Sequence, residues 1–119
     1  MSEMKKTIFI DIDGCLIEHR GNLTAEILCE PTILPGVLDK LNEWDGNGYK
    51  IILTTGRKES MRKVTEEQLS MVGIFYDQLI MGLNRGERII INDVKPGIDM
   101  KVASAYQIPR NEGLSKLKI

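Results

Sequence analysis

One stretch near the N-terminus, residues 7–17, constrains the fold of this chain more than any other. It begins with an apolar run of Ile and Phe that is typical of a buried strand. The run leads into Asp11 and Asp13, whose i, i+2 spacing places both carboxylates on the same side of an extended backbone. Two like charges held so close repel each other unless a cation or a proton lies between them. With Gly14 next, the stretch predicts either an acidic turn or a cation site at a strand end.

A second acidic strand end favours the cation site. The apolar run Ile89-Ile90-Ile91 is followed directly by Asn92 and Asp93. Mg²⁺ prefers hard oxygen ligands and is commonly held by one or two carboxylates together with substrate phosphate. The pattern therefore predicts a Mg²⁺ site that serves phosphate chemistry.

The composition is that of an ordinary globular protein, with 42% apolar and 28% charged residues among 119. This length suits a single domain over residues 1–119 with one modest core. The net charge of −1 shows no electrostatic footprint for nucleic acid or an anionic membrane. No apolar run approaches a membrane span, and the two cysteines have no zinc-type spacing, so we expect a reduced, cytoplasmic protein. Cys15 adjoins the acidic pair, which should raise its thiol pKa and make it a poor nucleophile.

Strand and helix patterns alternate along the rest of the chain. The segment 18–35 is polar and irregular, and we expect a small hairpin or a flap over the end of the first strand. We expect further strands at 49–54, 77–81 and 88–92. We also expect a helix that begins at Pro35-Gly36, a helix at 58–72, and a last helix capped by Asp99. The apolar face of the first of these helices consists of Val37, Leu38, Leu41 and Trp44.

This alternation predicts a Rossmann-like α/β fold, an open parallel sheet with helices on both faces. Ligands of such sheets bind beyond the carboxyl ends of the strands. The polar residues that end the predicted strands should therefore converge on one edge; they are Asp11, Asp13, Thr54, Thr55, Asn92 and Asp93.

Three motifs in this order resemble those of the haloacid dehalogenase-like (HAD) phosphatases. Asp11-Ile12-Asp13-Gly14 is similar to the first motif, Leu53-Thr54-Thr55-Gly56-Arg57 to the second, and Ile90-Ile91-Asn92-Asp93 to the fourth. The resemblance covers most of the chain and implies a Rossmann-like core. Neither connection where the family carries a cap domain is long enough to hold one, so the chain resembles a capless member.

The resemblance also implies the reaction. It suggests a Mg²⁺-dependent phosphatase of small phosphorylated metabolites, with a sugar phosphate as one candidate substrate. Asp11 would attack phosphorus to form an aspartyl-phosphate, and Asp13 would protonate the leaving alcohol and then activate water. Asp11, the Asp13 main-chain carbonyl and Asp93 would bind Mg²⁺. Thr55, helped by backbone N–H groups at Gly56, would contact the phosphoryl group. The alternative role of Thr55 is to cap the following helix. In that case Thr54 is the alternative phosphate contact.

The sequence departs from the family in two places. Asn92-Asp93 stands where many relatives have two acidic residues, which leaves open which of the pair is the principal ligand. The lysine that the family carries before the fourth strand is missing between Leu79 and Asp93. Four residues could supply its charge: Lys95, which we rank first because it follows Asp93 closely, then Arg85, and also Arg88 and Lys58.

Two other functions stay open. A relative without catalytic activity could use the same site for binding. A phospho-acceptor module like a response-regulator receiver also has Mg²⁺ at strand ends, but its acidic pair is normally adjacent and its acceptor follows a later strand. Assembly into a homo-oligomer is also left open.

Overall fold

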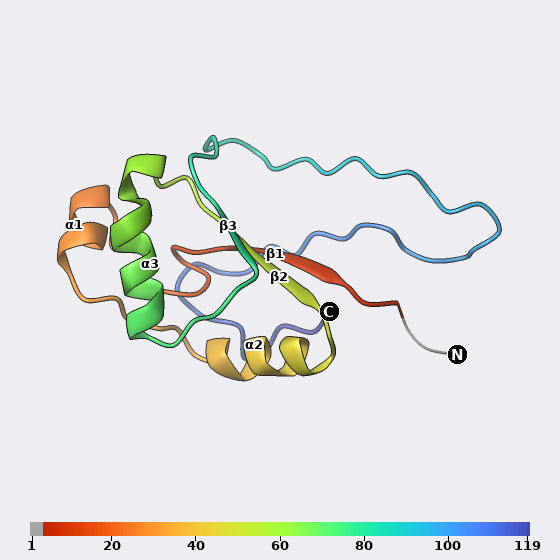
Figure 1. Ribbon diagram of the computed structural model, residues 1–119, viewed down its shortest axis with the longest axis horizontal. Coiled ribbons are helices and arrows are strands. Elements are labelled where there is room, and N and C mark those ends of the chain that lie inside the picture. The colour runs from red at the N-terminus through yellow and green to blue at the C-terminus, as the bar shows by residue number, and fades with distance from the viewer. Residues whose placement is uncertain (1–3) are drawn as a thin grey trace.

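The computed structural model describes residues 4–119 (Figure 1). Its regular elements all lie in the first two thirds of the chain. In order they are β1 (Thr7–Asp11), α1 (Leu23–Leu28), α2 (Val37–Gly46), β2 (Lys50–Thr54), a 3₁₀ turn η1 (Glu59–Met61), α3 (Arg62–Met71) and β3 (Gln78–Ile80). No helix among the described residues is long and apolar enough to cross a membrane.

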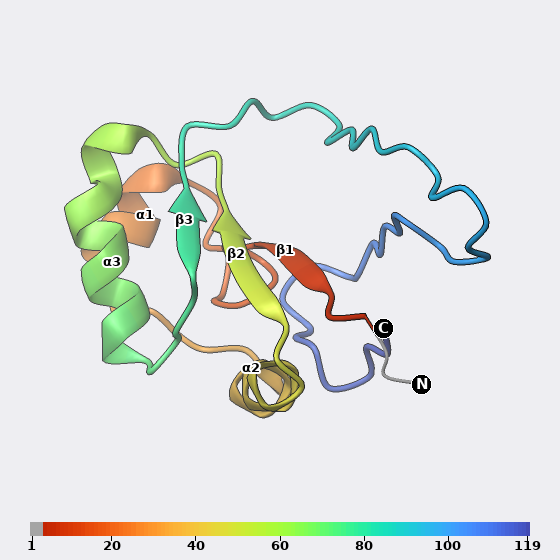
Figure 2. The ribbon, with the colours of Figure 1, turned by 45° about the vertical axis from the view of Figure 1, so that its right-hand side comes forward.

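The sheet is open and parallel, and within residues 4–119 it has three strands in the order β1-β2-β3. Figure 2 shows the strands side by side. The register aligns Asp11 of β1 with Thr54 of β2, and Thr54 with Ile80 of β3. Adjacent parallel strands need a long crossover connection. The connection from β1 to β2 contains α1 and α2, and the connection from β2 to β3 contains η1 and α3. The predicted Rossmann-like α/β fold is confirmed.

The two faces of the sheet differ sharply in burial. On one face Ile10, Ile51 and Leu53 belong to the core, and Leu53 is fully buried. On the other face Phe9 is 52% exposed and Ile80 is 38% exposed. Successive side chains of a strand point to opposite faces, so this alternation means that one face is packed and the other is open. Among the described residues, the second layer of helices that we expected does not cover the open face.

Helix α2 packs against β2 and largely follows the sequence prediction. Val37, Leu41 and Trp44 are buried at helical spacing, whereas Leu38 is 37% exposed and lies off the buried face. Gly36 precedes the helix with a positive φ of 77°, and a Cβ there would approach the Ser115 backbone nitrogen to 2.6 Å. A side chain at this position would therefore collide with the C-terminal tail.

The irregular segment 18–35 forms a loop whose ends pair like a hairpin. The Glu18 N–H donates to the Thr32 carbonyl at 2.9 Å, and Ile17 forms an antiparallel bridge with Ile33. Between these ends lies the short helix α1, whose first turn is capped by the Asn22 side chain. The hairpin expectation is therefore met at the base of the loop.

The predicted fourth strand and the helix after it do not form. Every residue from 84 to 101 is exposed and without regular structure, and we call this stretch the exposed segment. Ile89 and Ile91 are 74% and 90% exposed, and Asp99 caps no helix. Figures 1 and 2 show the chain leaving the sheet after β3, running far out and returning. An apolar run becomes a strand only when a neighbouring strand pairs with it, and residues 88–92 pair with no strand among the described residues.

The C-terminal tail, by contrast, is part of the core although it has no helix or strand. Leu114 is 1% exposed, and its N–H donates to the Pro35 carbonyl at 2.8 Å. Asn111 accepts from the His19 N–H at 2.7 Å and donates to the His19 carbonyl at 3.1 Å through its side chain. These contacts join the end of the chain to the segment that follows the first acidic motif.

We expect Leu114→Ala to lower the free energy of unfolding by about 2–5 kcal/mol, as typical for removing a fully buried leucine side chain. Urea denaturation followed by circular dichroism measures this change. Leu28→Ala is the matched control, because Leu28 is 77% exposed and should change stability little. Equal stability of the two variants would show that the tail is not packed as described.

Candidate active site at the carboxyl edge of the sheet

Asp11 ends β1 at the carboxyl edge of the sheet, next to the end of β2. The Thr54 hydroxyl donates to the Ile10 carbonyl at 3.3 Å and so ties the two strand ends together. The Asp11 side chain is 43% exposed. A carboxylate held on a rigid strand end and open to solvent is available to a ligand.

A tight turn follows and places Asp13 beside Asp11. The Gly14 N–H donates to the Ile17 carbonyl at 2.8 Å, and the Leu16 N–H donates to the Ile12 carbonyl at 2.9 Å. Gly14 has a φ of 91°, which an L side chain rarely adopts. The glycine thus lets the chain reverse immediately after the second carboxylate.

Asp13 is held by a buried arginine from the end of the second motif. Arg57 is 3% exposed, and its Nε and Nη2 donate to the two Asp13 carboxylate oxygens at 2.9 and 2.7 Å. Its Nη1 donates to Thr65 Oγ1 at 3.1 Å and to Gln68 Oε1 at 2.6 Å, both on α3. The ion pair is therefore bidentate and is supported from behind by a helix.

Asp11 has a different neighbour, Arg88. The guanidinium Nη1 of Arg88 lies 3.8 Å from Asp11 Oδ1 and 3.5 Å from Thr54 Oγ1. Burial raises the pKa of Asp11 above its ordinary value and the negative charge of Asp13 adds to this, while the positive charge of Arg88 opposes it. Any further cation at this edge would favour the charged form of Asp11 in the same way.

Thr55 and Gly56 lie at the same edge, between β2 and Arg57. Thr55 is 2% exposed, and its hydroxyl oxygen accepts the Arg57 N–H at 3.0 Å, as a residue capping a turn does. The hydroxyl keeps its own proton, because accepting a hydrogen bond does not consume it. The capping role is thus observed, and the phosphate role stays a prediction.

Asp93 and Lys95 are not brought to this edge. Both lie in the exposed segment, where Lys95 Nζ is 3.6 Å from Asp93 Oδ1 and the Asp93 side chain is 80% exposed. Among residues 4–119 the structure gathers no group of three or more acidic, His or Cys side chains suited to a metal ion. The predicted roles of Asp93 in metal binding and of Lys95 in phosphate binding are therefore unsupported by this arrangement and stay predictions.

Cys15 is unlike a nucleophile, as we expected. Burial, together with the negative charge of Asp11, raises the pKa of the Cys15 thiol to about 11. Very little thiolate is present at neutral pH, and the thiolate is the reactive form.

Sequence reasoning missed the buried polar residues on α3 and underrated Arg88. In the helix predicted at 58–72, helical spacing puts Met61, Val64, Leu69 and Val72 on the apolar face, yet Thr65 and Gln68 are also buried, at 0% and 4% exposure. Thr65 and Gln68 do fall at i, i+3 on the face that carries Leu69, and that spacing was the available signal. No pattern in the sequence distinguished Arg88 from the other cations nearby.

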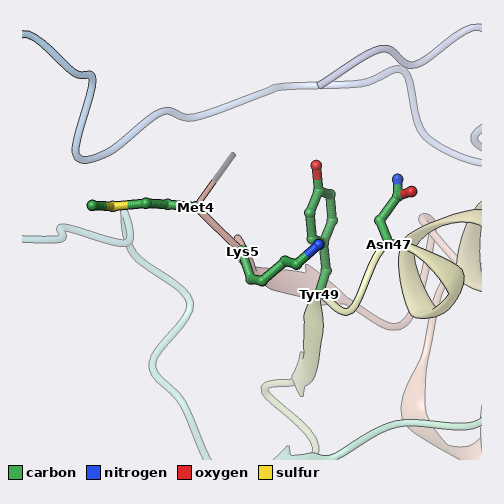
Figure 3. A pocket seen from close by; sticks show the side chains of 4 residues that line it. All are labelled: Met4, Lys5, Asn47 and Tyr49. Carbon is green, nitrogen blue, oxygen red and sulfur yellow. The ribbon is translucent and has the colours of Figure 1, made fainter. Parts of the chain in front are cut away.

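The small cavity in Figure 3 lies away from this edge. Met4, Lys5, Asn47 and Tyr49 line it, and its volume is about 100 Å³. Lys5 precedes β1 and Tyr49 precedes β2, so the cavity sits at the amino ends of the strands. It therefore has no part in the acidic site.

We expect Asp11→Asn to be more stable than the wild type at neutral pH in the presence of a chelator. A carboxyl group whose pKa is raised by folding favours the folded state below its ordinary pKa of 3.8, and this contribution is lost as pH rises through the folded value. The amide cannot ionise, so its advantage should shrink as pH falls toward 3.8. Urea denaturation across this pH range measures the difference, with Asp99→Asn in the exposed segment as the control. A less stable Asp11→Asn protein at neutral pH would contradict the prediction.

Neither a protein-family model nor a curated protein matches this sequence. Among solved structures, a chain of the Pnkp1/Rnl/Hen1 complex is similar, with 30% sequence identity and a TM-score of 0.57. The match covers 71% of this chain and 30% of that chain. This protein therefore resembles, in both sequence and α/β fold, one part of a much longer chain.

Proposed function

We propose that this chain is a Mg²⁺-dependent phosphatase that hydrolyses a phosphate monoester through an aspartyl-phosphate. One observation carries the proposal: two carboxylates lie at the carboxyl edge of a parallel sheet, each beside its own guanidinium group. Asp11 is accessible, while Asp13 is fixed by Arg57. The similarity to part of a chain in the Pnkp1/Rnl/Hen1 complex supports the proposal, since it extends over most of this chain.

The two carboxylates have separate tasks in this reaction. A carboxylate oxygen of Asp11 forms a bond to phosphorus as the bond from phosphorus to the leaving oxygen breaks. Asp13 gives that oxygen a proton, and then takes a proton from the water that attacks the aspartyl-phosphate. Water supplies the oxygen that leaves as inorganic phosphate, and Asp11 returns to its starting form.

Two groups are placed to bind the phosphoryl oxygens. Arg88 brings a positive charge within 3.8 Å of Asp11, where a phosphate dianion would otherwise be repelled by the nucleophile. The Thr55 hydroxyl and the Gly56 N–H follow the same strand end and can donate to the phosphoryl oxygens. In this proposal Arg88, rather than Lys95, supplies the charge of the lysine that the family carries before the fourth strand.

The charge of this edge supports Mg²⁺ binding, although the described residues gather no group of three acidic side chains there. The half-buried Asp11 carboxylate, next to a second negative charge, is stabilised in its charged form by any cation. Asp11 and the Asp13 main-chain carbonyl would hold the ion, with water and substrate oxygens completing its coordination. The ion would supply positive charge that offsets the repulsion between the nucleophile and the phosphoryl group.

In this arrangement Arg88, and not Asp93, is the neighbour of Asp11. Four residues lie between Arg88 and Asp93, and the five steps from one to the other span about 16 Å in an extended chain, at roughly 3.3 Å per step. With Arg88 beside Asp11, the Asp93 carboxylate therefore stays remote unless the exposed segment folds back.

We expect Mg²⁺-dependent release of phosphate from small monoesters such as nitrophenyl phosphate, glycerol phosphate and sugar phosphates. Asp11→Asn should abolish release, because an amide is a poor nucleophile of nearly the same shape. The assay measures phosphate with Mg²⁺ and with excess chelator, and circular dichroism verifies that the variant is folded. Wild-type release by the folded variant would exclude Asp11 as nucleophile. Phosphate binding without turnover of any substrate would indicate a binding protein instead.

We expect Arg88→Met to lower kcat/KM at least about tenfold, which corresponds to about 1.4 kcal/mol of transition-state stabilisation. Steady-state kinetics should be run in parallel on Arg85→Met and Lys95→Met, the matched controls from the same segment. Both controls should keep activity within about twofold. A loss confined to Lys95→Met, with Asp93→Ala raising the Mg²⁺ requirement, would instead show that the segment folds back.

A further inference from the structure

The most tightly held polar group among the described residues near the site is the Arg57 guanidinium. It is almost completely buried, and removing a charge from water is costly unless the charge is paired and hydrogen-bonded. Four of its five N–H groups donate, two to Asp13 and two to α3. Arg57 thus has almost no rotational freedom left.

The support from α3 is specific in its chemistry. Thr65 and Gln68 lie one helical turn apart on the buried face, and each aims an oxygen at Arg57 Nη1. An aliphatic residue at either position would fill the space but would leave a buried N–H group without an acceptor. The two oxygens therefore determine how the guanidinium plane is turned.

The orientation of Arg57 determines that of Asp13. A guanidinium group that donates through two parallel N–H bonds fixes the plane of the carboxylate as well as its distance. Each carboxylate oxygen has two lone-pair positions, so each keeps one free after accepting from Arg57. The free positions are where a proton would be held, and their direction follows from the plane.

We propose that Arg57 is a positioning residue, which, held by Thr65 and Gln68, turns the Asp13 carboxylate toward the leaving oxygen of the substrate. This inference rests on the proposed function, because it assumes that Asp13 transfers a proton. It adds that α3 is part of the catalytic support: a chain of contacts runs from the buried face of the helix, through Arg57, to the proton donor.

The test compares two substrates that need the proton to different degrees. Nitrophenyl phosphate has a good leaving group and needs little protonation, whereas an alkyl phosphate depends on it. Gln68→Met removes one acceptor at similar size and leaves the Arg57–Asp13 pair in place, and Arg57→Lys keeps the charge but loses the two-point contact. Both variants should lose about tenfold in kcat on the alkyl phosphate and less than about threefold on nitrophenyl phosphate.

Two controls make the result specific. Arg62→Lys changes another arginine of the same region, whose side chain is 36% exposed and paired with Glu59, and it should alter neither rate. On an Asp13→Asn background, Gln68→Met should have almost no further effect on the alkyl phosphate, because it acts through Asp13. Urea denaturation of each variant gives its folded fraction, by which the rates are corrected.

Equal losses on both substrates, or no loss in the folded Gln68→Met protein, would overturn the inference while leaving the phosphatase proposal intact. If Arg57→Lys does not fold, Gln68→Met alone decides. Absence of turnover by the wild type on both substrates would overturn the proposed function, and with it this inference. An additional loss from Gln68→Met on the Asp13→Asn background would show that Gln68 acts by another route.

Discussion

The parallel pairing of β1 with β2 is the interaction on which the rest of this structure depends. Its register sets Asp11 opposite Thr54, and therefore sets the first acidic motif beside Thr55 and Arg57, which follow β2. The motifs are more than forty residues apart in the chain, yet their positions relative to each other follow from hydrogen bonds in the sheet. A slip of one residue would turn every side chain of β1 to the opposite face and separate these groups.

The negative charges of Asp11 and Asp13 are each paired with an arginine, but to different degrees. Asp13 shares both oxygens with a buried guanidinium group, whereas Asp11 has one guanidinium at a longer distance and is open to solvent. The proposed reaction needs Asp11 in its charged form, which its raised pKa opposes, so a cation beside Asp11 would have to favour that form. Burial is the main cause of the raised pKa of Asp11, the positive charge of Arg88 opposes it, and the negative charge of Asp13 adds to it.

The open face of the sheet and the exposed segment both present apolar side chains to solvent. Phe9 and Ile80 on that face are partly exposed, and so are the isoleucines of the apolar run at 89–91. Large apolar surfaces that face water are uncommon in small proteins and usually mark sites of contact. Because Arg88 lies beside Asp11 at the start of the run, any rearrangement of the segment would also change the charge next to Asp11.

The sequence by itself determined the strands at β1, β2 and β3, the helices α2 and α3, and the convergence of Asp11, Asp13 and Thr55 on one edge. Periodicity and the direction of parallel strands suffice for these, because they depend on near neighbours and on the geometry common to all such sheets. Only the tertiary structure decided that residues 88–92 do not pair with β1, that Arg88 rather than Asp93 lies beside Asp11, and that Arg57, Thr65 and Gln68 form one buried network. Those outcomes depend on which residues, distant in the sequence, come into contact in the folded protein. Local propensity and periodicity do not determine such contacts.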